Sequence, residues 1–262
     1  MKIALLFGLN YKACASGHLR GCHEDVQNIK KYLQKEHAYL ENNIRAFNDE
    51  ENPQDTSKDG IVSNIMNLAK ESWKQPIKEV FIHYSGHGGQ MFDTQRKEND
   101  NKNECLIPSD YEKNGVISDD YLNRLFQCFN PNTHVIFVCD ACHSGTMADT
   151  KYKYNIDTEN DEIIETQNND AKNIDCDLIC ISGCKDSQTS ADAYNVNDKH
   201  LFSGALSSCL LQALKEKKGD TQISCQNLFK NVKNLLKQKG FTQLPIITSS
   251  RNLDFQKRQL FI

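Results

Sequence analysis

A histidine and a cysteine lie in two short glycine-bearing segments, and each segment follows an apolar run. His87 lies in SGHGG at positions 85–89, directly after the apolar run 80–84, and Cys142 lies in DACHSG at 140–145, after the run 135–139. A neutral thiol is a weak nucleophile near pH 7, and an adjacent imidazole would withdraw or balance its proton. If the fold brings them together, these two residues could carry out nucleophilic catalysis.

The surrounding elements predict how they would meet. Short apolar runs alternate with helical periodicity, which is typical of an α/β domain with a mainly parallel sheet. The runs predict strands at 3–8, 43–47, 80–84, 135–139, 178–182 and 244–248, and the periodic stretches predict helices at 24–36, 61–68, 202–214 and 228–236. Because ligands bind at the carboxyl ends of parallel strands, we expect His87 and Cys142 to face each other at one edge of the sheet.

Composition excludes several classes of protein. The chain has 262 residues, a formal net charge of −4 and a sequence pI near 6.1. A nucleic-acid-binding protein would carry a positive field, and a membrane protein an apolar run of about 20 residues, so we expect neither. An odd count of 11 cysteines favours a reducing, cytoplasmic location. Residues 2–15 loosely resemble a signal peptide, but Asn10 interrupts the short apolar stretch.

Other motifs compete for the same residues. Cys139 and Cys142 form a C-x-x-C pair that a thioredoxin-like redox protein would use, and with His143 they match the signature of c-type haem attachment. His83 and His87 could mimic a metal pair, although Gly86 disfavours the helix that such a pair needs. The simpler interpretation makes Cys139 and His83 buried core residues.

Two polar segments, 93–103 and 151–177, contain too little apolar surface to offset the entropy of ordering them. We therefore expect both to be solvated loops. The second follows Cys142 closely, so it is also a candidate for a segment that is cut or displaced.

In these motifs the chain resembles the metacaspases, caspase-like cysteine peptidases that cut after Arg or Lys. The similarity spans nearly the whole chain, in the family's order: LRGCHEDV at 19–26, YSGHGG at 84–89, DACHSG at 140–145, ISGCKDSQTSAD at 181–192 and QLP at 243–245. The 55 positions between His87 and Cys142 also resemble the spacing of about 50 in caspases.

The resemblance implies a caspase-like fold in a single domain over 1–262. Residues 1–150 would be the large-subunit-like part, 151–177 a mobile acidic loop and 178–262 the small-subunit-like part. The resemblance further implies a minimal type I catalytic core without an N-terminal prodomain. The family also implies a monomer.

Roles for individual residues follow from the resemblance. His87 and Cys142 would form the catalytic dyad, and the backbone N–H groups of Gly88 and Cys142 would form the oxyanion hole. The first specificity pocket would be lined by Cys22, Asp25, Ser85 and Asp140. Two carboxylates there could hold a guanidinium or an ammonium group by charge-assisted hydrogen bonds, which predicts protein and peptide substrates with Arg or Lys at the cleavage site.

Calcium is the cofactor that the resemblance implies, with Asp119, Asp120 and Asp149 at the matching positions. A further aspartate of the family is replaced by Asn103 beside Glu104, so we expect weaker or altered calcium dependence.

Self-processing is a hypothesis that rests on Lys151, Lys153 and Lys172, which follow Cys142 and would suit an acidic pocket. The main alternative function is a catalytically inactive caspase-like scaffold that binds partners.

Overall fold

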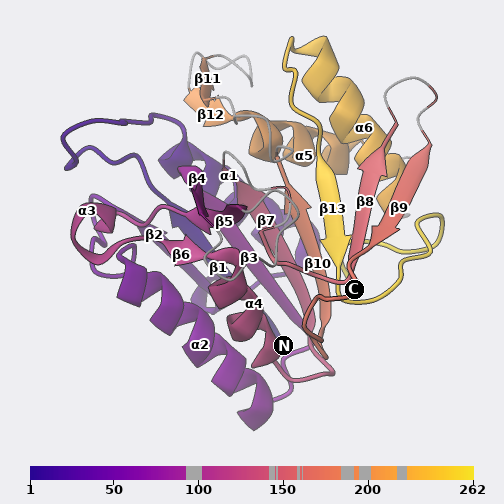
Figure 1. The fold of residues 1–262 in the computed structure, drawn as a ribbon, viewed down its shortest axis with the longest axis horizontal. Coiled ribbons are helices and arrows are strands. Elements are labelled where there is room, and N and C mark those ends of the chain that lie inside the picture. Colours follow the sequence, from indigo (N-terminus) through magenta and orange to yellow (C-terminus); the bar gives the residue numbers. More distant parts are fainter. Residues whose placement is uncertain are drawn as a thin grey trace.

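A mainly parallel sheet with helices on both faces organises the chain (Figure 1). The structure is a computed structural model, and it describes residues 1–92, 102–141, 145, 147–157, 160, 162–183, 192–194, 202–216 and 223–262. Cys142 lies outside the described residues, as do most of the segment 93–103 and of the motif 181–192. The architecture confirms the predicted α/β fold class with a mainly parallel central sheet flanked by helices.

The central sheet has eight strands among the described residues, in the order β2-β1-β3-β7-β10-β13-β8-β9. The first five strands in this order pair in parallel. The remaining pairs, β10 with β13, β13 with β8 and β8 with β9, are antiparallel. The predicted strands β7 and β10 lie at its centre, as expected for apolar runs buried on both faces. The bounds are β1 (Lys2–Gly8), β2 (Ile44–Asn48), β3 (Glu79–Ser85), β7 (His134–Asp140), β8 (Tyr152–Ile156), β9 (Ile163–Gln167), β10 (Asp177–Ser182) and β13 (Ile246–Ser249).

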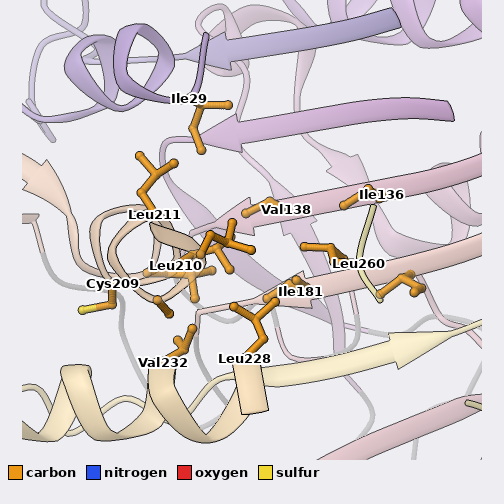
Figure 2. Packing of buried hydrophobic residues seen from close by; sticks show 14 of the residues in the cluster. Ile29, Ile136, Val138, Ile181, Cys209, Leu210, Leu211, Leu228, Val232 and Leu260 are labelled. Atoms are coloured by element: carbon orange, nitrogen blue, oxygen red, sulfur yellow. The ribbon is translucent and has the colours of Figure 1, made fainter. Parts of the chain in front are cut away.

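Alternating side chains of the sheet bury two separate apolar clusters. In β1, Ala4 and Leu6 join the cluster that includes helices α1, α5 and α6, whereas Leu5 and Phe7 join the cluster that includes α2 and α4. Figure 2 shows the first cluster, with side chains from β7 and β10 against those of α5 and α6. The helix bounds are α1 (Cys22–His37), α2 (Lys58–Lys74), α4 (Asp119–Gln127), α5 (Ala205–Lys215) and α6 (Cys225–Gln238).

Serine caps fix where three of these helices begin. The Ser57, Ser118 and Ser224 side chains each accept a hydrogen bond from the backbone N–H three residues ahead, at the starts of α2, α4 and α6. Such caps satisfy one of the N–H groups that a helix leaves without an internal partner.

Smaller elements complete the described fold. Strands β4 (Gly88–Phe92), β5 (Lys102–Leu106) and β6 (Ile117–Ser118) form a separate antiparallel sheet, and β11 (Asp192–Tyr194) pairs with β12 (Phe202–Gly204). A short helix α3 (Tyr111–Asn114) and a 3-10 turn η1 (Glu41–Asn43) lie in connections. The helix predicted at 202–214 begins only at Ala205, because the preceding three residues form β12.

The expectation that 151–177 is a solvated loop was wrong for much of the segment. Residues of β8 and β9 form a hairpin that continues the central sheet beyond β13. Tyr154 and Ile156 are buried in the core at 1% and 3% exposure, respectively. An antiparallel strand can pack one face on the core and leave the other face in water, so alternating apolar residues suffice where the average composition is polar.

The segment after β13 returns to the starts of the central strands. Phe261 stacks against His37 and Phe81, with ring centroids 3.6 and 5.8 Å away. The buried ring of His134 contacts the carbonyl oxygen of Leu260 through Nε2 at 2.7 Å, and its Nδ1 lies 3.1 Å from a carboxylate oxygen of Asp177.

The carboxylate of Asp177 makes the stability of this region depend on pH. Burial alone would raise its pKa, but the His134 ring and the Arg258 guanidinium lower it from 3.8 to about 2. An acid with a lowered pKa stabilises the fold above its unfolded pKa, and this stability is lost as the pH falls toward the folded value. We therefore expect Asp177→Asn to lower the free energy of unfolding by about 2 kcal/mol at pH 6, with the difference shrinking toward pH 2.

Urea unfolding at pH 6, 4 and 2 measures this difference. Asp254→Asn is the control, because the contacts of the half-exposed Asp254 carboxylate, an ion pair with Lys257 and a hydrogen bond from the Gln256 N–H, lie within one surface segment. A constant difference between wild type and Asp177→Asn across this range would contradict the electrostatic origin.

Candidate active site

The two segments with the candidate dyad leave the sheet side by side. Strands β3 and β7 are parallel neighbours, and their register places Ser85 opposite Asp140 at the last paired position. One residue later, the backbone N–H of Gly86 donates to the carbonyl oxygen of Asp140 at 3.3 Å. His87 and the start of the Cys142 segment therefore lie at one edge of the sheet, although Cys142 itself is not among the described residues.

The His87 ring is held on one side by the loop that follows β1. Its Nε2 lies 2.5 Å from the carbonyl oxygen of Gly17. A carbonyl oxygen can only accept a hydrogen bond, so Nε2 carries the proton and Nδ1 is the nitrogen left for proton exchange. The ring also contacts Tyr11, with centroids 4.6 Å apart.

The predicted pocket acids, Asp25 and Asp140, meet at the N-terminus of α5. Both are buried, at 1% and 4% exposure. Asp25 accepts hydrogen bonds from the Ser85 hydroxyl at 2.7 Å and from the Gly204 N–H at 3.0 Å, and Asp140 accepts one from the Ser207 N–H at 2.8 Å. The partial positive charge at the start of a helix stabilises two such carboxylates in a site otherwise costly for negative charge.

Gly204 shows how closely the two acids approach each other. A Cβ atom at this position would lie 2.2 Å from Oδ2 of Asp140 and 2.8 Å from Oδ2 of Asp25. Any side chain at residue 204 would therefore displace one carboxylate or both.

Cys22 and Ser85 complete the set predicted for the pocket. Cys22 is buried as the first residue of α1, and its N–H donates to the Asn10 side chain at 3.1 Å. Ser85 is buried as the last residue of β3 and donates to Asp25. Ser85 and Asp25 are therefore hydrogen-bonded to each other. Asp25 and Asp140 are connected through the start of α5, where each accepts a backbone N–H group.

Gly88, the predicted oxyanion residue, opens β4. The Ile107 N–H donates to the His87 carbonyl oxygen at 3.1 Å, which makes the His87/Ile107 position a hydrogen-bonding one in the β4–β5 ladder. Positions alternate in an antiparallel ladder, so the Gly88 N–H points away from β5.

The candidate calcium residues are only partly gathered. Asp119 is buried and accepts backbone hydrogen bonds from Glu104 and Asp120 at 2.8 and 2.6 Å. Burial raises its pKa to about 6, and the charge of Asp149 also raises it. Asp120 lies 3.7 Å from the ammonium group of Lys172. Across the described part of the chain, no group of three or more His, Cys, Asp or Glu side chains is arranged to hold a metal ion.

The donor chemistry therefore suits calcium at Asp119, where buried carboxylates lie near one another, but the three aspartates do not converge as a ligand set. Asn103, the position where the family's aspartate is replaced, lies in β5 beside Glu104.

Sequence analysis missed several residues that contact the predicted site residues, among them Tyr11, Gly17, Gly204 and Ser207. Each lies in a loop or at a helix start, and no motif marks it. For Gly17 one signal existed, because the loop after β1 must lie at the same sheet edge as those after β3 and β7.

Comparison with known proteins identifies the family. A family model described as the metacaspase, peptidase C14 domain matches residues 2–151. The chain is 30% identical to Metacaspase-1 of Eremothecium gossypii, over 96% of this chain and 64% of that protein, and 30% identical to Metacaspase-2 of Trypanosoma brucei brucei, over 97% and 74%. It is 31% identical to Metacaspase-1 of Plasmodium falciparum but spans only 41% of that protein. The chain thus spans less than two thirds of some of these relatives.

The fold also matches a solved structure. A crystal structure of a protein from Geobacter sulfurreducens superposes with a TM-score of 0.67, at 21% identity, over 99% of this chain and 98% of that one. Separately, none of the helices in the described ranges has the length and apolarity needed to cross a bilayer.

The crowding at Gly204 predicts the effect of a single methyl group. We expect Gly204→Ala to lower the free energy of unfolding by about 1–3 kcal/mol, because the added Cβ overlaps two buried carboxylates. Urea denaturation measures the change. Gly89→Ala is the control, since its Cβ would meet the Cys105 sulfur and the Ile107 side chain at an ordinary 3.4 Å. Equal losses in both variants would show that residue 204 is not crowded in solution.

Proposed function

Because the chain belongs to the metacaspase family of peptidases, we propose that it is a cysteine endopeptidase that cleaves after Arg or Lys. One observation carries the proposal: two buried carboxylates, Asp25 and Asp140, lie at the sheet edge from which the His87 segment emerges. The activity, the substrates and the partners are all part of this proposal.

The proposed reaction uses His87 and Cys142 as a dyad. His87 Nδ1 takes the thiol proton of Cys142, and the thiolate attacks the carbonyl carbon of the scissile peptide bond. His87 then gives that proton to the leaving amine as the C–N bond breaks, and water hydrolyses the thioester. The bond from Nε2 to Gly17 supports these roles because it fixes the tautomer in which Nδ1 accepts.

The oxyanion formed during attack would be stabilised by backbone N–H groups of Gly88 and Cys142. The direction of the Gly88 N–H, away from β5, supports this assignment. A fixed donor of this kind needs no reorganisation when the charge develops.

Specificity for Arg or Lys is supported by the charge of the pocket. Each carboxylate is already desolvated and hydrogen-bonded, so a substrate cation adds a favourable partner without a further cost of burial on the protein side. A substrate Asp would bring a third negative charge to the same place. Asp25 and Ser85 come from different elements, α1 and β3, whose positions the sheet fixes.

We also propose that calcium stimulates the enzyme weakly, with Asp119, Asp120 and Asp149 as ligands that converge only when the ion binds. The support is electrostatic: burial, and to a smaller extent the charge of Asp149, raise the pKa of Asp119, and a bound cation would oppose both effects. Asn103 offers a neutral oxygen in place of a charge, which is why a modest effect is expected.

A monomer in the cytoplasm is the proposed state. Strand β13 pairs with β10 on one side and β8 on the other, so its hydrogen-bonding groups are used within the chain. This pairing supports a protein that does not dimerise through its last strand. The reducing location rests on the odd number of cysteines.

Peptide hydrolysis tests the proposal. We expect fluorogenic peptides ending in Arg or Lys to be cleaved, peptides ending in Asp to be left intact, and Cys142→Ala to abolish the activity. Asp25→Asn and Asp140→Asn should each lower kcat/KM for Arg peptides about a hundredfold, as expected when one partner of a buried charge pair is removed. Calcium should raise the rate, and a chelator should lower it without abolishing it.

Asp254→Asn is the control for the loss of an acid far from the pocket. Cleavage after Asp would refute the acidic pocket. No Cys142-dependent cleavage of any peptide would favour the inactive scaffold.

Self-processing is part of the proposal, and the three lysines differ in their surroundings. Lys153 lies inside β8, between β9 and β13. The Lys151 carbonyl oxygen accepts a hydrogen bond from the Asn168 N–H at 2.8 Å, so its peptide bond is also fixed. Lys172 lies outside the strands with a half-exposed side chain, and its exposed ion pair with Asp120 is weak.

We therefore expect self-cleavage after Lys172. Intact-mass spectrometry after incubation with calcium should show two fragments from wild type and from Lys153→Gln, and an uncut chain from Lys172→Gln and from Cys142→Ala. Fragments from Lys172→Gln with the wild-type masses would contradict this choice of site.

A further inference from the structure

We infer that Tyr11 is a positioning residue for His87, acting on its backbone through the tyrosine hydroxyl and on its imidazole through the tyrosine ring. The inference rests on the proposed peptidase function, in which His87 moves the proton. Tyr11 belongs to the loop after β1 and has no assigned role in the reaction.

The hydroxyl group of Tyr11 connects two segments of the site. It accepts a hydrogen bond from the His87 N–H at 2.8 Å and donates to the carbonyl oxygen of Ile107 at 2.6 Å. Burial raises the pKa of Tyr11 well above its ordinary value, so the hydroxyl keeps its proton and can make both bonds. The residue is 1% exposed, which excludes water as a ready substitute partner.

A second tyrosine holds the other backbone group of His87. The hydroxyl of Tyr84 lies 3.0 Å from the His87 carbonyl oxygen, 2.8 Å from the Ile107 carbonyl oxygen and 3.0 Å from the Tyr11 hydroxyl. Because the His87 carbonyl oxygen also accepts the Ile107 N–H at 3.1 Å, both peptide groups that flank the His87 side chain are fixed. With its backbone held, the imidazole needs only the Tyr11 ring and the Gly17 carbonyl to fix its plane and direction.

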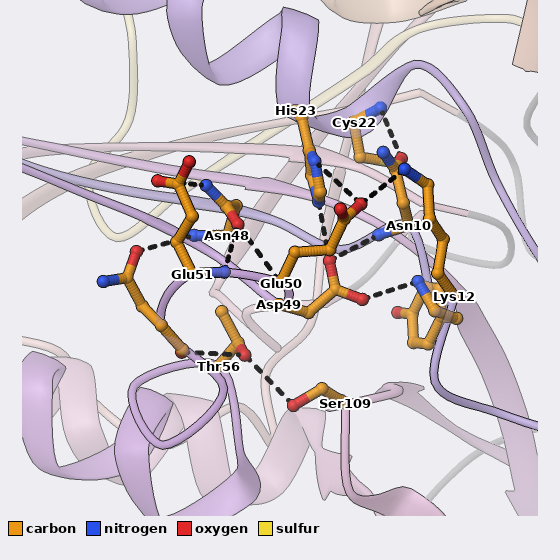
Figure 3. A network of polar contacts seen from close by, with 12 residues as sticks. Asn10, Lys12, Cys22, His23, Asn48, Asp49, Glu50, Glu51, Thr56 and Ser109 are labelled. Atoms are coloured by element: carbon orange, nitrogen blue, oxygen red, sulfur yellow. Dashed lines mark hydrogen bonds and ion pairs between the residues drawn. The ribbon is translucent and has the colours of Figure 1, made fainter.

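The backbone at Tyr11 is strained, which indicates that its placement is maintained by other contacts. Its φ is +57°, a left-handed conformation that a bulky residue rarely adopts. Asp49 accepts the N–H groups of Asn10 and Tyr11 at 2.9 and 2.6 Å, and His23 contacts the same carboxylate at 2.7 Å (Figure 3). This network offsets the strain and directs the Tyr11 side chain toward His87.

The fit at Gly86 is independent evidence for the closeness of this arrangement. A Cβ atom there would lie 2.8 Å from the Tyr11 hydroxyl and 2.9 Å from the Tyr84 hydroxyl. The turn before His87 thus leaves space for the two hydroxyls that hold it. A shift of this turn would move the His87 ring and the adjacent Gly88 N–H together.

Tyr11→Phe tests the inference, because it keeps the ring and removes the hydroxyl. We expect kcat for Arg peptides to fall about tenfold with KM within twofold, since the pocket acids are untouched while the proton-transfer geometry loosens. Tyr11→Leu, which also loses the ring contact, should lower kcat further, about a hundredfold. Tyr39→Phe is the matched control: it removes another buried tyrosine hydroxyl, one that donates to Glu79 at 2.9 Å near the start of β3.

A second measurement does not depend on catalysis. In protein labelled with ¹⁵N-histidine, the His87 Nε2–H bonded to Gly17 should exchange with water more slowly than the N–H of a free imidazole, and His87→Gln identifies its signal. We expect the exchange to be at least tenfold faster in Tyr11→Phe and unchanged in Tyr39→Phe.

The outcomes separate this inference from the proposed function. Wild-type kcat together with wild-type exchange in Tyr11→Phe would overturn the positioning role, and so would a lower kcat with unchanged exchange. If the wild-type protein hydrolyses no peptide, faster exchange in Tyr11→Phe than in wild type would support the positioning of His87 and refute the peptidase.

Discussion

The parallel pairing of β3 with β7 is the constraint on which the site depends. Parallel neighbours must end at the same edge of a sheet, and here the register carries the pairing up to Ser85 and Asp140. Two segments more than fifty residues apart in the sequence thereby become adjacent through backbone hydrogen bonds alone. The loop after β1 and the starts of α1 and α5 reach the same edge, so the sheet also places Gly17, Gly204 and Ser207, which contact His87, Asp25 and Asp140, respectively.

Negative charge at this edge is tolerated because backbone donors surround it. Asp25 and Asp140 receive N–H groups from the start of α5, where the helix dipole also favours anions. The nearby His83 is fully buried, which lowers its pKa to about 3, so it stays neutral and contacts the Ser207 hydroxyl at 2.9 Å. A charged imidazole here would neutralise the pocket acids, and its burial prevents that. The predicted interpretation of His83 as a buried core histidine is thus confirmed.

Periodicity and the sheet-edge rule predicted the class of fold, the central strands and the location of His87 from sequence. They failed where tertiary contacts override composition. The hairpin of β8 and β9 was expected to be a loop, since its mean composition is polar, yet Tyr154 packs on the core. The role of Gly204 was equally hidden, because a glycine before a helix has no signature that reveals two carboxylates beside it. The placement of Tyr11 depends on a left-handed backbone conformation and on its contact with His87, 76 residues away. No local sequence pattern predicts either feature.

The order of strands also determines what a cut after Lys172 would do. Strands β8 and β9 precede that bond and β10 and β13 follow it, yet in the sheet β10 and β13 lie between β7 and β8. The second fragment would therefore remain paired with the first on both sides, through β7 with β10 and through β8 with β13. Cleavage would free the ends near Asp120 without separating the fragments, and α5 would keep its hydrogen bonds to Asp25 and Asp140. A cut at this position is compatible with an intact pocket, because the contacts that assemble the site do not require continuity of the chain at residue 172.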